Sequence, residues 1–234
     1  MRFYNPANCE REDCDDVSVA LRRGLVPSVT SILSVIRYEH LETWYIKKSL
    51  ERYCATGDMA EAVAYRDTTA ADFGTACHSL VEAHLTGNAC TVGHDRRHQA
   101  AVEPLLRWLD RNVAEVVLCE APFADSVLCY GGTADMLLRL TGGRLLLADV
   151  KCKKHSRKYP MQPDICYKYQ LSAYRHHFSQ YYGEMSIANF LLASPFGWTP
   201  QPYLLVCDYG SEDWMDGFNA ALRLWMEQHG GTAR

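Results

Sequence analysis

The feature that most constrains the fold of this 234-residue chain is a change of hydrophobic period near Val113. Before it, apolar residues recur every three or four positions, as they do from Phe73 to Val81, and this spacing is typical of helices. After it, short runs rich in Val and Leu are separated by turn residues such as Gly142-Gly143, which predicts strands. A chain with both patterns is expected to fold as an α/β protein, with helices packed on a sheet.

The order of these elements predicts one domain over residues 26–234, preceded by an irregular, acidic segment at 1–25. The helical part of the domain covers 26–112, and a β-β-β-α-β core covers 113–228. We expect one helix to open at Ser28 and others to cover 40–54, 58–66, 70–86, 95–112, 163–181 and 211–228. The expected strands are 114–121, 127–140, 144–152, 185–193 and 202–207.

The stretch LLLADVKCKK, residues 145–154, begins as a buried strand and then places Asp149 and Lys151 two positions apart, on one face. Asp135 lies on the preceding strand, and the turn between the strands decides whether it meets Asp149. A two-residue turn would put the two aspartates on opposite faces. A three-residue loop, Thr141-Gly142-Gly143 with Gly143 in the left-handed conformation, would pair them directly. We expect that loop, or a bulge with the same effect.

Two close carboxylates repel each other, and burying them without a partner costs several kcal/mol. A divalent cation removes that cost, and aspartate oxygens with waters and a backbone carbonyl suit Mg²⁺ or Mn²⁺. Lys151 beside such an ion could orient or deprotonate an attacking water, or offset charge that develops on a phosphate. The alternative is an ordinary salt bridge between Asp149 and Lys151 at the end of a strand.

Two expected helices carry polar residues at helical spacing. Gly74, His78 and Glu82 form one row, in which the glycine allows a close approach to the imidazole. Its alternative is a histidine satisfied at the border of the core, with Glu82 in water. Gln170 and Tyr174 lie four residues apart after the basic segment, which suits a phosphate backbone. An ordinary amphipathic helix is the alternative there.

In chain order, these motifs are G-x-x-x-H-x-x-x-E, G-G-x-x-D, D-x-K and Q-x-x-x-Y, on a helix, two strands and a helix. The ordered set resembles the PD-(D/E)XK nuclease superfamily, in the RecB-type branch that includes the mitochondrial genome maintenance exonuclease and its phage and bacterial relatives. The resemblance covers about residues 26–228 and includes VPSVTSIL at 26–33 and the helix with Trp44. It implies a restriction-endonuclease-like core, a mixed central sheet flanked by helices, with a helical N-terminal half.

By this resemblance, the metal ligands are His78, Asp135, Asp149 and the Val150 carbonyl, and the expected cofactor is Mg²⁺ or Mn²⁺. The implied catalytic residues are Asp135, Asp149, Lys151 and Gln170. Glu82 and Glu120 are placed less firmly by the motifs. Many members have Glu where this chain has Asp149, and the flanking KCKK is more basic than in the family.

Some relatives hold an iron–sulfur cluster with a C-terminal group of cysteines. Here only Cys207 lies beyond Cys166, so we expect no iron–sulfur cluster. The ten cysteines are scattered without a CxxC pair, which favours reduced thiols. Cys9 and Cys14 stand without nearby partners, so a zinc site there is not expected.

The partner that the resemblance implies is DNA, single-stranded or with a free end, and a recombination or replication protein is a further expected partner. The formal net charge is −4, so a nucleic acid would be met locally, beginning at the basic stretch 151–158. Ser28 and Thr30 open a helix whose free N–H groups suit a phosphate, although an N-cap explains them equally well. The residues expected to contact nucleic acid are Ser28, Thr30, Lys153, Lys154, Tyr174 and Arg175.

No window approaches the roughly 18 uninterrupted apolar residues that a membrane span requires. The N-terminus has neither the apolar core of a signal peptide nor the Arg-rich, acid-poor composition of a mitochondrial presequence. We therefore expect no membrane partner and a cytoplasmic location, in a bacterium or a phage-infected host.

The expected function is a Mg²⁺- or Mn²⁺-dependent DNA exonuclease that hydrolyses phosphodiester bonds and prefers single strands or free ends, in recombination, repair or genome maintenance. One alternative is a structure-specific or restriction-like endonuclease of the same fold. A second is a catalytically idle DNA-binding module, and a third is a helical protein-interaction domain. The last would leave the placement of Asp135, Asp149 and Lys151 to chance.

Overall fold

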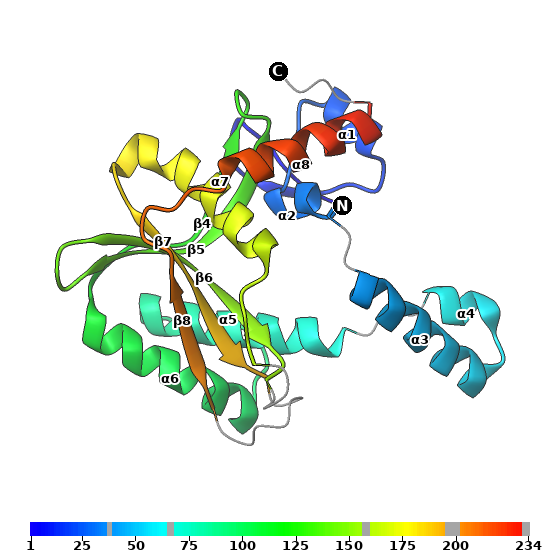
Figure 1. The fold of residues 1–234 in the computed structure, drawn as a ribbon, viewed down its shortest axis with the longest axis horizontal. Helices are drawn as coiled ribbons and strands as arrows, with labels where there is room; N and C mark the ends of the chain where they lie inside the picture. The colour runs from blue at the N-terminus through cyan, green and yellow to red at the C-terminus, as the bar shows by residue number, and fades with distance from the viewer. Residues whose placement is uncertain (37–38, 65–67, 156–159, 195–201, 231–234) are drawn as a thin grey trace.

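The computed structural model describes residues 1–36, 39–64, 68–155, 160–194 and 202–230. Its centre is a five-stranded sheet in the order β4-β5-β6-β7-β8 (Figure 1). The strands are β4 (Val113–Asp125), β5 (Tyr130–Leu140), β6 (Leu145–Lys153), β7 (Ser186–Ala193) and β8 (Leu204–Asp208). Only β6 and β7 pair in parallel, and the chain between them forms α7 (Ile165–Tyr182). The helical crossover is the connection that a parallel pair requires.

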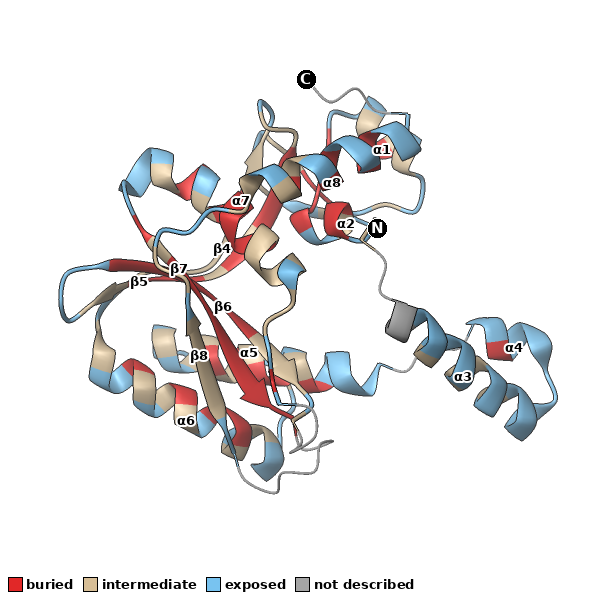
Figure 2. Ribbon diagram, viewed as in Figure 1, coloured by how far each residue is buried: buried red, intermediate tan, exposed pale blue. Residues whose placement is uncertain are grey.

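Helices cover both faces of this sheet, and each face has its own hydrophobic core (Figures 1 and 2). One core lies beneath α5 (Thr69–Thr86) and α6 (Arg96–Asn112). The other lies beneath α2 (Val29–Leu33), α7 and α8 (Met215–Gln228). The expected fold class, a mixed sheet flanked by helices with a more helical N-terminal half, is confirmed.

The β5–β6 connection has the form expected from the sequence. The Leu140 amide donates to the Arg144 carbonyl, and Gly143, at φ 85°, donates its N–H back to the Leu140 carbonyl. A positive φ of this size is strained for most residues but open to glycine. The three-residue loop Thr141–Gly143 therefore sets the register, in which Leu138 pairs with Leu146 and Met136 with Ala148.

Residues 1–25 are not irregular, and this expectation was wrong. They contain β1 (Arg2–Tyr4), β2 (Arg11–Asp13) and α1 (Val17–Arg22), and β1 also pairs with β3 (Val26–Pro27) in a second, three-stranded sheet. Phe3 and Ala20 are fully buried in the same core as α7 and α8. Strands of two or three residues are too short to show an alternating pattern, so the sequence did not reveal them.

Two helices, α3 (Glu39–Thr56) and α4 (Met59–Ala64), pack mainly on each other and lie to one side of the sheet (Figure 1). Nearly all of their described surface is exposed (Figure 2), and Ala62 is buried between them. The final helix α8 begins at Met215, four residues later than the expected start at about 211, and the Trp214 amide just before it donates to the Ser172 hydroxyl.

Candidate metal centre

Three acidic residues form a row across β4, β5 and β6. The β4–β5 register, with Cys119 opposite Met136 and Ala121 opposite Ala134, puts Glu120 opposite Asp135. Continued by one residue, the β5–β6 register puts Asp135 opposite Asp149. The two aspartates therefore share a face of the sheet, as the three-residue loop predicted.

A histidine from the neighbouring helix completes a group of possible ligands. His78 Nδ1 on α5 lies 3.3 Å from Asp135 Oδ2. Ligand atoms of His78, Glu120 and Asp135 all lie within 4.8 Å of one another. Ligands on opposite sides of an ion at about 2.1 Å would be about 4.2 Å apart, so these side chains need to move by less than about 1 Å to share one. One imidazole nitrogen and two carboxylates therefore fit a divalent cation such as Mn²⁺ or Mg²⁺.

The backbone of Val150 faces the same group. Its N–H donates to Asp135 Oδ2 at 2.8 Å, at the point where the β5–β6 ladder ends. In a strand, the N–H and C=O of one residue face the same neighbouring strand. The Val150 carbonyl thus faces the β5 side, consistent with its expected place among the ligands.

Asp149 is held differently, because three side chains donate to its two oxygens. Lys151 Nζ at 2.8 Å and Gln170 Nε2 at 3.0 Å reach Oδ1, and Asn189 Nδ2 at 3.1 Å reaches Oδ2. Asn189 in turn accepts a hydrogen bond from the Tyr209 hydroxyl. Asp149 is 1% exposed, so these donors replace the water that a carboxylate otherwise needs.

The pKa values of this cluster reflect burial first and neighbouring charge second. Burial, together with Asp135, raises the pKa of Glu120 to about 7. Burial also raises the pKa of Asp149 to about 6, and Lys151 partly offsets that effect. For Lys151 itself burial acts against the charge, but Asp149 and Asp135 together outweigh it and the pKa of the amine is raised. Lys151 is therefore a cation and not a neutral base at neutral pH.

Close packing explains the two glycines of the G-G-x-x-D motif. A Cβ atom at Gly132 would lie 2.7 Å from Cε1 of Tyr174, and one at Gly131 would lie 2.7 Å from the Phe123 carbonyl oxygen. Tyr174 also accepts a hydrogen bond from Gln170 Nε2 at 3.2 Å. Gly132 therefore allows α7 to approach β5 closely enough for Gln170 to reach Asp149, and Gly131 allows the close approach of Phe123 on β4 and Tyr4 on β1.

The structure does not gather all the residues expected to contact nucleic acid. Ser28 and Tyr174 are each only 3% exposed, so in this conformation neither side chain offers an open surface to a phosphate. Ser28 instead accepts the Ser31 amide as the N-cap of α2 and is hydrogen-bonded to Thr30, which is exposed. The second interpretation of this segment, an ordinary N-cap, is the one that the structure supports.

The two lysines expected to contact nucleic acid, Lys153 and Lys154, have different surroundings. Lys154 is exposed, whereas Lys153 Nζ is bonded to Asp164 at 2.7 Å and to the Gln162 carbonyl at 2.9 Å. Lys151 and Lys153 both lie over the Tyr167 ring, at 5.4 and 5.2 Å from its centroid. The basic stretch therefore begins beside the acids, and its first two lysines, Lys151 and Lys153, both contact the Tyr167 ring.

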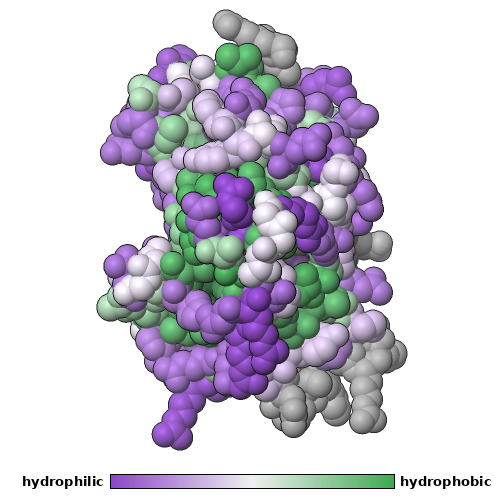
Figure 3. All heavy atoms as spheres, turned by 90° about the vertical axis from the view of Figure 1, so that its left-hand side faces the viewer, coloured by the Kyte–Doolittle hydropathy of each residue, from purple (hydrophilic) through white to green (hydrophobic). Residues whose placement is uncertain are grey.

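Arg175 lies away from the acidic row. Its guanidinium pairs with Asp213 at 3.0 Å and lines a cavity of about 680 Å³ together with Arg139 and Arg144. This cavity lies where the β5–β6 loop meets the C-terminal end of α7. On the face that Figure 3 shows, hydrophobic patches lie near the middle and hydrophilic side chains border them. Arg175 is therefore not part of the candidate metal centre.

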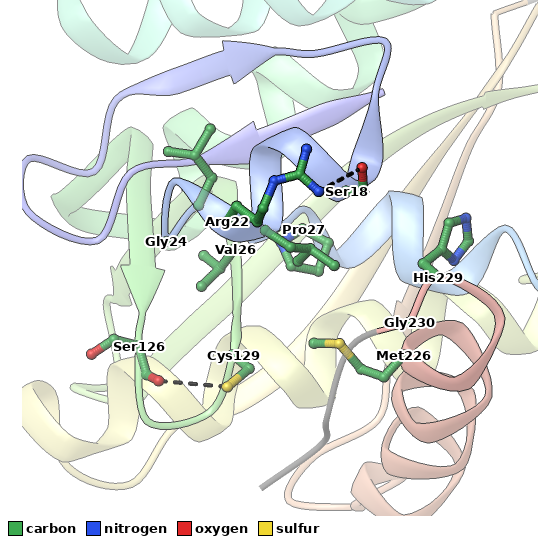
Figure 4. Close-up of a pocket in the computed structure, with 12 residues that line it drawn as sticks. Ser18, Arg22, Gly24, Val26, Pro27, Ser126, Cys129, Met226, His229 and Gly230 are labelled. Carbon is green, nitrogen blue, oxygen red and sulfur yellow. Dashed lines mark hydrogen bonds between the residues drawn. The ribbon is translucent and has the colours of Figure 1, made fainter.

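A second cavity, of about 540 Å³, also lies apart from the acids. It is bounded by α1, β3, the β4–β5 turn and the end of α8, and Figure 4 shows Arg22 hydrogen-bonded to Ser18 on its wall. Val26 and Pro27 of the VPSVTSIL segment line it, but none of the candidate metal ligands does.

Two members of the site were missed or underrated. Glu120 was placed only loosely by sequence motifs, although it meets Asp135 and His78 more closely than Asp149 does. Asn189 was not considered, yet it is fully buried and holds Asp149. A single amide in the otherwise apolar run SIANFLLA was the available signal, because a buried polar side chain must have a partner.

No family model and no curated protein matches this chain. Among solved structures it is similar to one titled "Crystal structure of SSO0001", at 10% identity over 81% of this chain and 86% of that chain, with a TM-score of 0.32. A likeness at this level supports no argument about function. Among the described residues, no helix has the length and apolar character needed to cross a membrane.

Proposed function

We propose that this protein is a divalent-metal-dependent DNA nuclease, and that it acts as an exonuclease on single strands or free ends. The observation that carries the proposal is the convergence of His78, Glu120 and Asp135 on one point, with the Asp149–Lys151 pair beside them. The ordered motifs of the PD-(D/E)XK superfamily in the sequence support the same function. By this proposal the chain is a member of that superfamily.

The donor set assigns distinct roles to the residues. His78, Glu120, Asp135 and the Val150 carbonyl would hold Mg²⁺ or Mn²⁺, with Asp149 adjacent as a further ligand. A bound ion of this kind stabilises negative charge on a phosphate and lowers the pKa of a water.

The chain's own groups would position the reacting water and phosphate. Lys151, held as a cation by Asp149 at 2.8 Å, would orient the water and offset charge that develops on the phosphate. Gln170 and Asn189 act as positioning residues, since they fix both oxygens of Asp149. Tyr167, whose ring contacts Lys151 and Lys153, would lie along the path of the nucleic acid. The exposed Lys154 would lie along the same path.

Purified protein with Mg²⁺ or Mn²⁺ should digest single-stranded DNA labelled at either the 5′ or the 3′ end, while leaving a covalently closed circle intact. Lys151→Ala should lower kcat by about 100-fold or more, because a charge-stabilising group is lost from the transition state. Lys47→Ala is the matched control, since Lys47 is an exposed lysine on α3.

The contrary outcomes are distinct. Labelled strands that are bound normally but stay whole with either metal would contradict a nuclease. Cleavage of the closed circle would replace the exonuclease by an endonuclease, and equal activity of Lys151→Ala and the wild type would remove Lys151 from the mechanism.

A further inference from the structure

The helix α3 carries a stripe of large apolar side chains that no other described residue buries. Ile46 is 62% exposed, Leu50 is 59% exposed and Tyr53 is 40% exposed. A helix turns by about 100° per residue, so Leu50 and Tyr53 lie only about 40° and 20° from Ile46 around the axis. The three side chains therefore form one narrow face, which we call the α3 stripe.

The opposite side of α3 packs on α4. Lys48 and Arg52 are half-buried there, and Arg52 pairs with Glu61 of α4. Because α3 and α4 contact mainly each other, the body of the protein does not cover the α3 stripe (Figure 1). Helices in proteins gain most of their stability from packing an apolar face, so an uncovered stripe of this kind indicates an interaction surface.

The spacing of the stripe and the charges beside it fit a second copy of the same helix. Ile46 and Tyr53 take position d of a coiled-coil heptad and Leu50 takes position a, which puts Glu42 at position g and Lys47 at position e. In a parallel pair of helices, a g residue faces the e residue five positions later on the other helix. Glu42 of each copy would therefore lie beside Lys47 of the other. Antiparallel helices place e against e and g against g, which gives no pair of opposite charges here.

We propose that two copies of this chain associate through the α3 stripe as a short, parallel coiled coil, with Glu42–Lys47 pairs on both of its flanks. A nucleic acid is a poorer fit to this surface, because α3 and α4 together carry four acidic and three basic residues, whereas a phosphate backbone requires a basic surface. The association does not depend on the proposed nuclease activity. Because α3 supplies no candidate metal ligand, its variants, Lys47→Ala among them, should keep the kcat of the wild type.

Sedimentation velocity of the full-length protein at increasing concentration should show a monomer that converts reversibly into a dimer. Leu50→Glu places two like charges opposite each other in the apolar seam, so it should raise the dissociation constant of the dimer at least tenfold. Val127→Glu is the matched control, because Val127 is an 80% exposed apolar residue in the turn between β4 and β5. Its dimer should be as stable as that of the wild type.

Exchange of the flanking charges tests the parallel orientation. Glu42→Lys alone puts a lysine beside each Lys47, and Lys47→Glu alone puts a glutamate beside each Glu42. Each variant by itself should therefore dimerise at least tenfold more weakly than the wild type. An equimolar mixture of the two variants should regain the affinity of the wild type, because each copy then meets the opposite charge. Recovery in the mixture also shows that both variants are folded.

A wild-type protein that stays monomeric at the highest concentration that remains in solution overturns the proposal. A dimer that Leu50→Glu leaves unchanged overturns it as well, and so does a mixture of the charge variants that associates no more tightly than either variant alone. If the wild type stays monomeric and Leu50→Glu weakens its binding to single-stranded DNA, the α3 stripe is a nucleic-acid surface instead. None of these measurements uses DNA cleavage, so a failure of the nuclease proposal leaves their outcome unaffected.

Discussion

Glu120 is the residue at which burial and function conflict most directly. Its φ of 46° is positive, which is uncommon outside glycine and occurs often at functional sites. Its pKa of about 7 means that the folded protein binds the proton more tightly than the unfolded chain does. Stability from this group is therefore complete below a pH of about 4.5 and is lost as the pH rises through about 7.

Without metal, Glu120→Gln should raise the melting temperature by a few degrees at pH 8 and change it little at pH 4.5, because the amide carries no buried charge. With Mn²⁺ the order should reverse, since the wild type gains stability from an ion that the variant binds more weakly. Thermal melts at both pH values measure this. Glu184→Gln, in the exposed connection between α7 and β7, is the control; equal responses of the two variants to Mn²⁺ would exclude Glu120 as a ligand.

A substitution at Gly74 should change the stability of the protein and the access of substrate in opposite directions. A Cβ atom at this helical position would have no atom within 4 Å, so Gly74→Ala should stabilise the protein by about 0.5–1 kcal/mol through helix propensity. If DNA passes over this side of α5, one turn before His78, kcat/KM should nevertheless fall. Urea unfolding and cleavage kinetics measure the two effects. Unchanged kinetics in a stabilised variant would show that nothing approaches this glycine during the reaction.

For individual residues, their separation in the sequence predicted part of the site and could not predict the rest. Asp149 and Lys151 stand two apart on a strand, and Gln170 and Tyr174 one helical turn apart, so their shared faces follow from local geometry. Glu120 meets Asp135 only through the register of a bulged β4–β5 pair, which local spacing does not determine. For the same reason, the burial of Tyr174 against Gly132 could not be deduced from its motif.

Among the elements, the contact between β5 and α7 sets the geometry of the site. Gly132→Ala should push Tyr174 and Gln170 away from Asp149 and destabilise the protein by about 1–3 kcal/mol, as overpacking does. Gly142→Ala, in the β5–β6 loop with no atom within 4 Å of its added Cβ, is the matched control and should change stability by less than about 0.5 kcal/mol. Equal denaturation midpoints for the two variants would contradict this account of the double glycine.

The long elements could be predicted because each repeats its period several times. The expected helix over 70–86 and the observed α5, Thr69–Thr86, differ by one residue, and Gly87 at φ 72° ends it. The β5–β6 loop was also predictable, because a three-residue loop with a glycine in the left-handed conformation joins these strands with both aspartates on one face. By contrast, β1 and β3 form through pairing with distant residues, so no local pattern indicates them.

At the scale of the whole molecule, the first strand and the last helix form one core. The ring of Phe3 lies edge-on to Trp225, with 6.4 Å between the ring centroids, and neither residue is exposed. Phe3→Ala should therefore lower the free energy of unfolding by about 3–5 kcal/mol. Tyr181→Ala removes an aromatic ring that is 69% exposed and should cost less than about 0.5 kcal/mol. A small effect of Phe3→Ala in denaturant titrations would show that the N-terminal strands are dispensable.

The contact between Phe3 and Trp225 also bears on how the chain is made. A ribosome releases Phe3 more than two hundred residues before Trp225, so the core that holds both cannot close until Trp225 has been made. The antiparallel strands β4 to β6, which are neighbours in the sequence, have no such delay. The nascent protein should therefore depend on chaperones for its first strand long after its central strands have paired.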